Sequence, residues 1–213
     1  MPLRLDIELT ETQKAAMAAI PRSSWFTQVV YNNAASPLHP NHRQLAENHS
    51  MKRALVEPWI AQSVKGKRVL DLFSSNGAFS IIAALAGARE VVGVEYSGER
   101  IRCAEFVAGT VGSDCRIAFR QGDVYRIAEY FEEPFDVTLC LGGLYHIADP
   151  AFLLRQARRL TRERLIVQTA RVLPLPGNWA KFVVRRRRGR EGGGDGSWHC
   201  SPGCVRKLLA HGG

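Results

Sequence analysis

From Arg68 to Arg171, short apolar runs alternate with segments that have the apolar spacing of helices. Five of these runs are predicted to be strands: RVLDLF, REVVGVEYS, RIAFRQ, FDVTLCLGGL and ERLIVQTAR. Apolar strands joined by helices of about ten residues predict a parallel sheet that is covered on both faces. Right-handed connections make such a sheet doubly wound. The alternation therefore predicts an α/β protein with a doubly wound (Rossmann-like), mostly parallel sheet, whose binding site lies at the carboxyl ends of its strands.

Residues 1–66 precede the alternation and are predicted to form a helical N-terminal segment that acts as a lid. The stretch TETQKAAMAAI has Thr10 or Thr12 as the N-cap of a first helix, with acidic residues in its first turn. A second helix is predicted over 43–64, with a bend near Pro58.

Residues 67–170 form the predicted binding core, and residues 171–213 follow it. The stretch 171–197 is rich in proline, arginine and glycine, which predicts a long flexible excursion. A final helix is predicted to have Pro202 in its first turn. Because a doubly wound sheet usually continues after such a helix, we expect the C-terminal strands to be missing from this chain.

The composition indicates the cellular compartment and the kinds of partner to expect. It has no apolar run near the ~20 residues of a membrane span, no secretory signal, and five scattered cysteines that fit reduced thiols. We therefore expect a cytoplasmic protein with no membrane partner. The net charge is +9, and the segment RRRRGR at 185–190 suits tRNA or a phosphorylated small molecule, although a solvated surface explains it equally.

The segment RVLDLFSSNGAFS is predicted to be a strand that turns tightly into a helix. Such a turn points unpaired backbone N–H groups at an anion. In dinucleotide-binding loops, glycines let a pyrophosphate approach closely, but here Phe73 and Ser75 fill two of those positions and only Gly77 remains. This pattern favours a smaller carboxylate, such as the tail of a methionine. Asp71 supplies a negative charge for the neighbouring ammonium group.

Two further acids follow the next strands. Glu95 ends the second strand, 24 residues after Asp71, where a carboxylate accepts hydrogen bonds from ribose hydroxyls. Asp123 follows the third strand, where it can bind an adenine amino group. Amino acid, ribose and adenine together indicate S-adenosylmethionine.

Residues 66–170 resemble a class I S-adenosylmethionine-dependent methyltransferase. VLDLFSSNGAFS resembles the first motif of that superfamily, VVGVEYS its ribose-binding acid and GDV its adenine-contacting turn. FDVTLCLGGLYHIADP resembles its fourth strand and the loop that follows. The departure is the glycine-poor first motif. The resemblance implies these cofactor-binding residues: Asp71, Phe73, Ser75, Asn76, Gly77, Glu95, Tyr96, Asp123, Val124 and Leu141.

The loop GLYH places Tyr145 and His146 at the mouth of the predicted site, and we identify both as candidate catalytic residues. An imidazole near neutral pKa can take a proton from a hydroxyl acceptor, although a loop histidine that only contacts backbone explains His146 as well. Tyr145 is expected to line the acceptor region. We expect no metal: His199, Cys200 and Cys204 lack an obvious fourth ligand.

Within the superfamily, the loop LGGLYHIADP and the late segment SWHCSPGCVRKLLAHGG are similar to the branch that contains the tRNA wobble-uridine carboxymethyltransferase. The favoured acceptor is a small molecule with a hydroxyl group, methylated by in-line displacement. The alternatives are a tRNA-modifying (carboxy)methyltransferase, which would use carboxy-S-adenosylmethionine, a nicotinamide-dependent oxidoreductase, and an inactive or truncated cofactor-binding remnant. The sequence does not predict an oligomeric state.

Overall fold

The computed structural model describes residues 2–112, 114–169, 175–185 and 195–211. Its N-terminal elements are β1 (Leu3–Arg4), α1 (Glu11–Ala19), the 3-10 turn η1 (Arg22–Ser24), β2 (Val29–Val30) and α2 (His42–Ser63). The central elements are β3 (Arg68–Leu72), α3 (Ala78–Leu85), β4 (Glu90–Glu95), α4 (Gly98–Thr110), β5 (Arg116–Gln121), η2 (Val124–Arg126), α5 (Ile127–Tyr130), β6 (Phe135–Leu141), η3 (Leu144–His146), α6 (Pro150–Arg159) and β7 (Thr161–Gln168). The last elements are β8 (Ala180–Arg185), β9 (Asp195–Cys200) and α7 (Pro202–His211).

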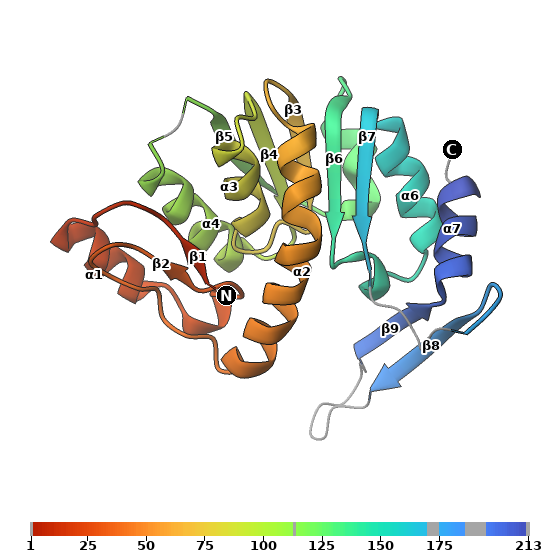
Figure 1. The fold of residues 1–213 in the computed structure, drawn as a ribbon, viewed down its shortest axis with the longest axis horizontal. Coiled ribbons are helices and arrows are strands. Elements are labelled where there is room, and N and C mark those ends of the chain that lie inside the picture. The colour runs from red at the N-terminus through yellow and green to blue at the C-terminus, as the bar shows by residue number, and fades with distance from the viewer. Residues whose placement is uncertain (1, 113, 170–174, 186–194, 212–213) are drawn as a thin grey trace.

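Strands β3 to β7 form one parallel sheet with the order β5-β4-β3-β6-β7 (Figure 1). The chain enters the sheet at β3, moves outward to β5 and then returns to β6 on the other side of β3. The carboxyl ends of β3 and β6 therefore meet where the strand order reverses, which is where ligands bind in open α/β sheets. The predicted doubly wound parallel sheet is confirmed.

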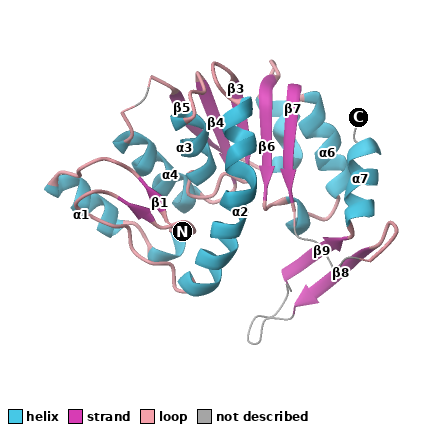
Figure 2. Cartoon of the chain, viewed as in Figure 1, coloured by secondary structure: helices cyan, strands magenta, loops and turns pink. Residues whose placement is uncertain are grey.

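Helices cover both faces of the sheet (Figure 2). Alternate residues of each strand face opposite sides, so one strand contributes to two cores. Val69 packs in a cluster with Ile60 of α2, whereas Leu70 and Leu72 pack in a second cluster with Leu153 of α6. The central strands β3, β4 and β6 are largely buried, which explains why they appear in the sequence as apolar runs, whereas the edge strands β5 and β7 are partly exposed.

The N-terminal segment contains the two helices that the sequence predicts. Thr10 caps α1 in a capping box with Gln13, and α2 continues through Pro58 without a break. Between the helices, β2 pairs in parallel with β1, which precedes α1. Trp25, which is 1% exposed, lies in a core cluster that also contains Ile81 of α3.

The C-terminal part corrects the sequence-based expectation. We predicted a flexible excursion over 171–197, but β8 and β9 form an antiparallel pair. The rings of Phe182 and Trp198 lie opposite each other across this pair, with their centroids 4.9 Å apart. Such a cross-strand aromatic contact stabilises a strand pair that the arginine- and glycine-rich composition concealed. Helix α7 begins at Pro202, as predicted.

Candidate functional site

The carboxyl ends of β3, β4 and β5 bring the three predicted acids to one edge of the sheet. Asp71 pairs in register with Gly93 of β4, and Glu95 pairs with Gln121 of β5. Asp123 follows Gln121 by two residues and caps η2 by accepting a hydrogen bond from the Tyr125 N–H at 2.9 Å. Acids that are 52 residues apart in the chain (71 to 123) thus share one edge because the strands are parallel and adjacent.

The turn after β3 keeps the backbone of a glycine-rich loop without its glycines. Phe73 has φ 61° and Ser75 has φ 52°, and these are the described non-glycine residues with left-handed backbone. Gly77 also has positive φ, and a Cβ there would lie 2.9 Å from the Ala104 Cβ. Left-handed residues with side chains are strained by about 1 kcal/mol or more. Strain of this kind, held in a turn at a ligand-binding edge, suggests a functional constraint.

Buried hydroxyl groups in the same turn have no partner. Ser74 Oγ and Ser75 Oγ are both inaccessible to water, and neither makes a hydrogen bond to a residue that the structure describes. An unsatisfied buried polar group destabilises a protein by about 1–3 kcal/mol. Groups of this kind are therefore expected where a polar ligand completes the site.

Asp71 is buried, with 1% of its surface exposed, and its Oδ2 accepts a hydrogen bond of 2.7 Å from Ser80 Oγ. Burial raises its pKa to about 7, while the Ser80 hydrogen bond and the positive charge of Lys52 act in the opposite direction. An ammonium group placed beside Asp71 would favour the ionised carboxylate. The geometry therefore suits the role that the sequence assigns to this residue.

Glu95 is held in place by three donors. Its Oε2 accepts from the Ser75 N–H at 3.0 Å, and its Oε1 accepts from the Ser97 N–H at 3.0 Å and from Arg100 at 3.4 Å. The carboxylate therefore links the turn after β3 to the start of α4. A rigidly held acceptor at this position suits a ribose diol, because each carboxylate oxygen has more than one lone pair.

The other predicted cofactor-binding residues differ in their exposure to solvent. Tyr96 is 77% exposed, so its ring extends into solvent beside Glu95. Val124 and Leu141 are buried at the carboxyl ends of the strands. Asn76 is also buried, and its amide donates a hydrogen bond of 2.8 Å to the Thr27 carbonyl. The Asn76 side chain thus fastens the N-terminal segment to the turn, and a contact with the cofactor remains a prediction.

The loop after β6 forms the other wall of the site. The predicted strand extends to Leu144, but β6 ends at Leu141 because Gly142 adopts φ 78° and turns the chain. A Cβ on Gly143 would lie 2.0 Å from the Phe73 ring, so the ring packs directly on this glycine. The loop after β6 and the turn after β3 are therefore in contact.

Tyr145 and His146 lie in η3 of this loop, with their ring centroids 4.1 Å apart. Tyr145 is half-buried and burial raises its pKa, which keeps the phenol protonated at neutral pH. His146 is exposed, and its N–H donates to the Gly143 carbonyl at 2.9 Å. Their catalytic roles are still predictions.

Two residues at this edge were missed by the sequence analysis. Lys52 of α2 is half-buried, and a Cβ on Gly142 would lie 2.2 Å from its Nζ. Gln168 ends β7, and its Oε1 is buried without a partner among the described residues. A signal for Lys52 was present in the sequence: it precedes the buried Val56 by four residues and Ile60 by eight, so all three share one face of α2.

Other sequence-based expectations are not tested by the structure. Of the basic segment at 185–190, residues 186–190 lie outside the described residues, so the tRNA hypothesis has no structural test. Among the described residues, no group of histidine, cysteine or acidic side chains is arranged to hold a metal ion. Within the same residues, no helix is both long enough and apolar enough to cross a membrane.

Ubiquinone biosynthesis O-methyltransferases match part of the chain. A ubiquinone biosynthesis O-methyltransferase of Pseudomonas putida is 32% identical over 106 residues, which is 49% of this chain and 44% of that protein. The protein of the same name from Bordetella pertussis is 29% identical over 132 residues, or 61% of this chain and 48% of that protein. The chain therefore spans less than half the length of these relatives.

Solved structures share the fold. The N-terminal domain of EvdMO1, crystallised with S-adenosylhomocysteine (SAH), has a TM-score of 0.65 at 22% identity, covering 98% of this chain and 88% of that one. Magnesium protoporphyrin IX methyltransferase from Synechocystis, with bound S-adenosylmethionine, has a TM-score of 0.59 at 19% identity, covering 81% and 72%. The family model described as a methyltransferase domain matches residues 63–182, which is more than half of the chain. The chain therefore belongs to the methyltransferase domain family and not to the nicotinamide-dependent oxidoreductases.

Proposed function

We propose that this chain binds S-adenosylmethionine at the carboxyl ends of β3 to β6 and transfers its methyl group to a hydroxyl group of a small-molecule acceptor. The observation that carries the proposal is the convergence of Asp71, Glu95 and Asp123 on one edge of the sheet, opposite the loop that holds Tyr145. These acids suit, in strand order, an ammonium group, a ribose diol and an adenine amino group.

The residues present fit this cofactor. The buried hydroxyls of Ser74 and Ser75 lack partners among the described residues, and a polar ligand in the turn would satisfy them. The Phe73 ring packs on Gly143, and it stands where dinucleotide-binding loops have a glycine that lets the pyrophosphate approach. The site therefore favours a compact amino-acid group over a dinucleotide.

The protein's own part in the reaction is to position the cofactor and the acceptor and to exclude water from them. When bound, S-adenosylmethionine supplies a methyl group that is already activated by the sulfonium. The half-buried Tyr145 and the neighbouring His146 belong to the loop after β6, beside which an acceptor hydroxyl would lie. His146 has the chemistry to accept the hydroxyl proton, and Tyr145 to orient the acceptor oxygen.

The class of acceptor is supported by the named relatives. The ubiquinone biosynthesis O-methyltransferases match about half of the chain, and their name states methylation at oxygen. At about 30% identity over half of the chain, this similarity favours a hydroxyl acceptor without identifying the molecule.

Ligand-dependent unfolding tests the cofactor, with SAH as the probe. At 100 times its dissociation constant, a ligand that binds only the folded state stabilises it by about 2.7 kcal/mol. We expect stabilisation of this size from SAH and none from NAD. Absence of any shift at saturating SAH would overturn the proposal and favour a cofactor-binding remnant without function.

The acceptor is tested separately with S-adenosylmethionine that carries a labelled methyl group. We expect label in phenol or catechol test compounds and none in total tRNA. Label in tRNA, lost steeply as salt is added, would contradict the proposed acceptor class while leaving the cofactor intact.

A further inference from the structure

The ammonium group of Lys52 is enclosed at the carboxyl edge of the sheet without a direct partner. It makes no hydrogen bond and no ion pair within 4 Å to any residue that the structure describes. It lies beside Gly142, where a Cβ would be 2.2 Å from Nζ, and 5.9 Å from the centroid of the Phe79 ring. Burial lowers the pKa of Lys52, and the charge of Asp71 raises it.

Gln168 places a hydrogen-bond acceptor beside Gly142, the glycine that Lys52 also approaches. The Gly142 N–H donates to the Gln168 backbone carbonyl at 2.9 Å, which fixes the end of β7 beside the end of β6. The side-chain Nε2 donates to the Thr169 carbonyl at 3.3 Å, which leaves Oε1 as a buried acceptor without a partner. A Cβ on Gly142 would lie 3.6 Å from this oxygen. Lys52 and Gln168 therefore flank Gly142 with a free donor and a free acceptor.

The opposite charges of Lys52 and Asp71 do not pair directly. They interact electrostatically, but their charged atoms are not within the 4 Å of an ion pair. A half-buried cation and a buried carboxyl that stay apart are both poorly stabilised unless something charged lies between them. The α-carboxylate and α-ammonium of an amino acid form a group of that kind, because the two charges are opposite and are joined through one carbon.

We propose that Lys52 binds the α-carboxylate of the cofactor's amino-acid part and that Gln168 Oε1 accepts a hydrogen bond from its α-ammonium, which Asp71 also faces. The inference rests on the proposed function and assigns two residues of α2 and β7 to it. It changes the sequence-based expectation, in which the start of α3 alone held the carboxylate. Because α2 belongs to the N-terminal segment, cofactor binding also ties that segment to the sheet.

The test compares SAH with its decarboxylated analogue, S-adenosyl-3-thiopropylamine, by calorimetry on the full chain. We expect wild type to bind SAH at least about tenfold more tightly than the analogue, since a hydrogen bond to a charged group is worth about that factor. In Lys52→Met this ratio should fall to within about twofold, and Lys52→Arg should restore part of it. The exposed Lys65 gives the matched control Lys65→Met, which should keep the wild-type ratio.

Gln168 is tested with deaminated SAH, which keeps the carboxylate but lacks the ammonium. Gln168→Leu should reduce the preference for SAH over this ligand and leave the preference over the decarboxylated analogue unchanged. A ratio between two ligands is insensitive to a general loss of stability, so a merely structural role would not change it.

The outcomes separate the two proposals. If wild type does not bind SAH, the proposed function fails. If wild type binds SAH and Lys52→Met retains the full discrimination against the decarboxylated analogue, the assignment of Lys52 is overturned. Loss of turnover in Lys52→Met with that discrimination intact also overturns it, because the lysine would then act on the acceptor.

Discussion

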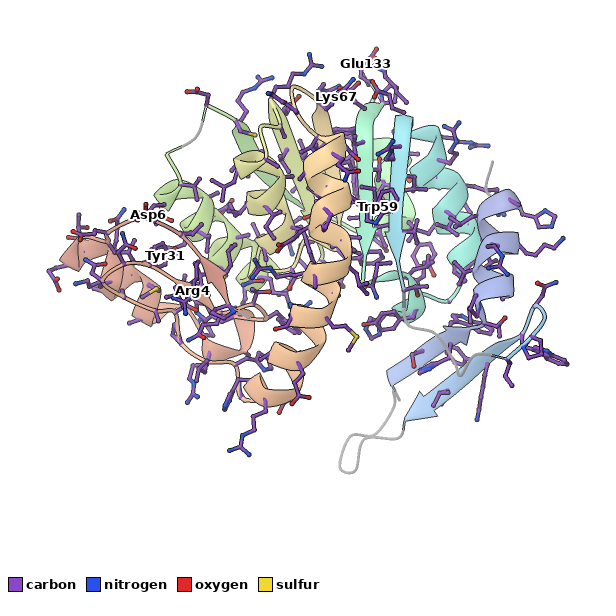
Figure 3. The ribbon with its side chains drawn as sticks, in the orientation of Figure 1. Arg4, Asp6, Tyr31, Trp59, Lys67 and Glu133 are labelled. Carbon is purple, nitrogen blue, oxygen red and sulfur yellow. The ribbon has the colours of Figure 1, made fainter. Side chains whose placement is uncertain are left out.

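The two ends of the parallel sheet use acidic residues in opposite ways. At the amino ends, carboxylates are paired: Glu90 lies 2.6 Å from Arg68, Glu133 2.7 Å from Arg162 and Glu163 2.6 Å from Lys67. Figure 3 shows Lys67 and Glu133 both at that end of the molecule, away from the carboxyl ends of the strands. At the carboxyl ends, Asp71 and Asp123 have no ion pair among the described residues, and of the three acids there only Glu95 has one, with Arg100 at 3.4 Å.

The difference separates stabilising groups from binding groups. A carboxylate that is already paired gains little from a ligand, whereas a buried carboxyl without a counter-charge destabilises the fold until a cation arrives. Position in the sheet therefore distinguishes the roles of chemically identical residues. The lack of an ion pair at Asp71 and Asp123 is consistent with a site built for a ligand that carries a positive charge and hydrogen-bond donors.

The largest expected effect comes from replacing one acid at each end. Asp71→Asn should weaken SAH binding about 10- to 100-fold, because a charge-assisted hydrogen bond to the ammonium is lost. The same change should leave the free energy of unfolding unchanged or slightly higher, since a buried carboxyl is removed. Calorimetric titration and denaturant unfolding of the same samples measure both quantities.

Asp136→Asn is the matched change at the amino end. Asp136 accepts a hydrogen bond from the Arg68 N–H at 2.8 Å and lies 3.7 Å from Arg89. We expect the variant to lose about 1 kcal/mol of stability and to bind SAH within twofold of wild type. Equal loss of affinity in both variants would erase the distinction between the two ends.

The pH dependence of SAH binding is the next largest effect. The pKa of Asp71 is raised to about 7 by burial, and the ligand's ammonium favours the ionised form, so binding below pH 7 must release a proton. Affinity should therefore rise about tenfold from pH 6 to pH 8. His49 does not titrate in this range, because burial lowers its pKa to about 4.

The same pKa shift acts on the ligand-free protein with the opposite sign. The folded state keeps the Asp71 proton up to about pH 7, whereas the unfolded chain loses it near 3.8. Stability from this group is therefore complete below 3.8 and is lost as pH rises through 7. Asp71→Asn should flatten both profiles; an unchanged profile in the variant would assign the titration to another group.

The smallest effect concerns the left-handed positions at the two ends. At the amino ends these are glycines, Gly66 with φ 70° and Gly87 with φ 90°, whereas Ser75 at the carboxyl end carries a side chain. Ser75→Gly should raise the free energy of unfolding by up to about 1 kcal/mol, because released strain exceeds the entropy that glycine adds to the unfolded chain.

Gly66→Ser is the reciprocal control, since no atom lies within 4 Å of the Cβ it would add. It should lose about 1 kcal/mol through backbone strain alone. Thermal unfolding of the two variants checks both signs. A loss of stability in Ser75→Gly would mean that the serine side chain supports the turn and does not strain it.

The sequence predicted the central sheet well, because β3, β4 and β6 are largely buried and therefore appear as apolar runs. It also predicted an N-cap at Thr10 or Thr12, and the structure shows Thr10 accepting a hydrogen bond at the start of α1. Each of these signals comes from residues that are neighbours in the sequence. The β8–β9 pair was missed because its support is a cross-strand contact between Phe182 and Trp198, which composition does not reveal.

The sequence likewise predicted only part of the candidate site. Acids at strand ends follow from strand positions, so Asp71, Glu95 and Asp123 were found. Lys52 and Gln168 were not, since their importance depends on two elements, α2 and β7, meeting at Gly142. The apolar periodicity of α2 would have placed Lys52 on its buried face, but it does not tell which strand end that face meets.

The contact between β9 and the loop after β6 also allows this loop to be followed by tryptophan fluorescence. Trp198 Nε1 donates a hydrogen bond of 3.2 Å to the Ala148 carbonyl, two residues beyond His146. An indole whose N–H is bound to a moving carbonyl changes its emission when that bond lengthens. With the other three tryptophans replaced by phenylalanine, Trp198 becomes an intrinsic fluorophore that follows the proposed acceptor loop in real time, without any label attached to the site.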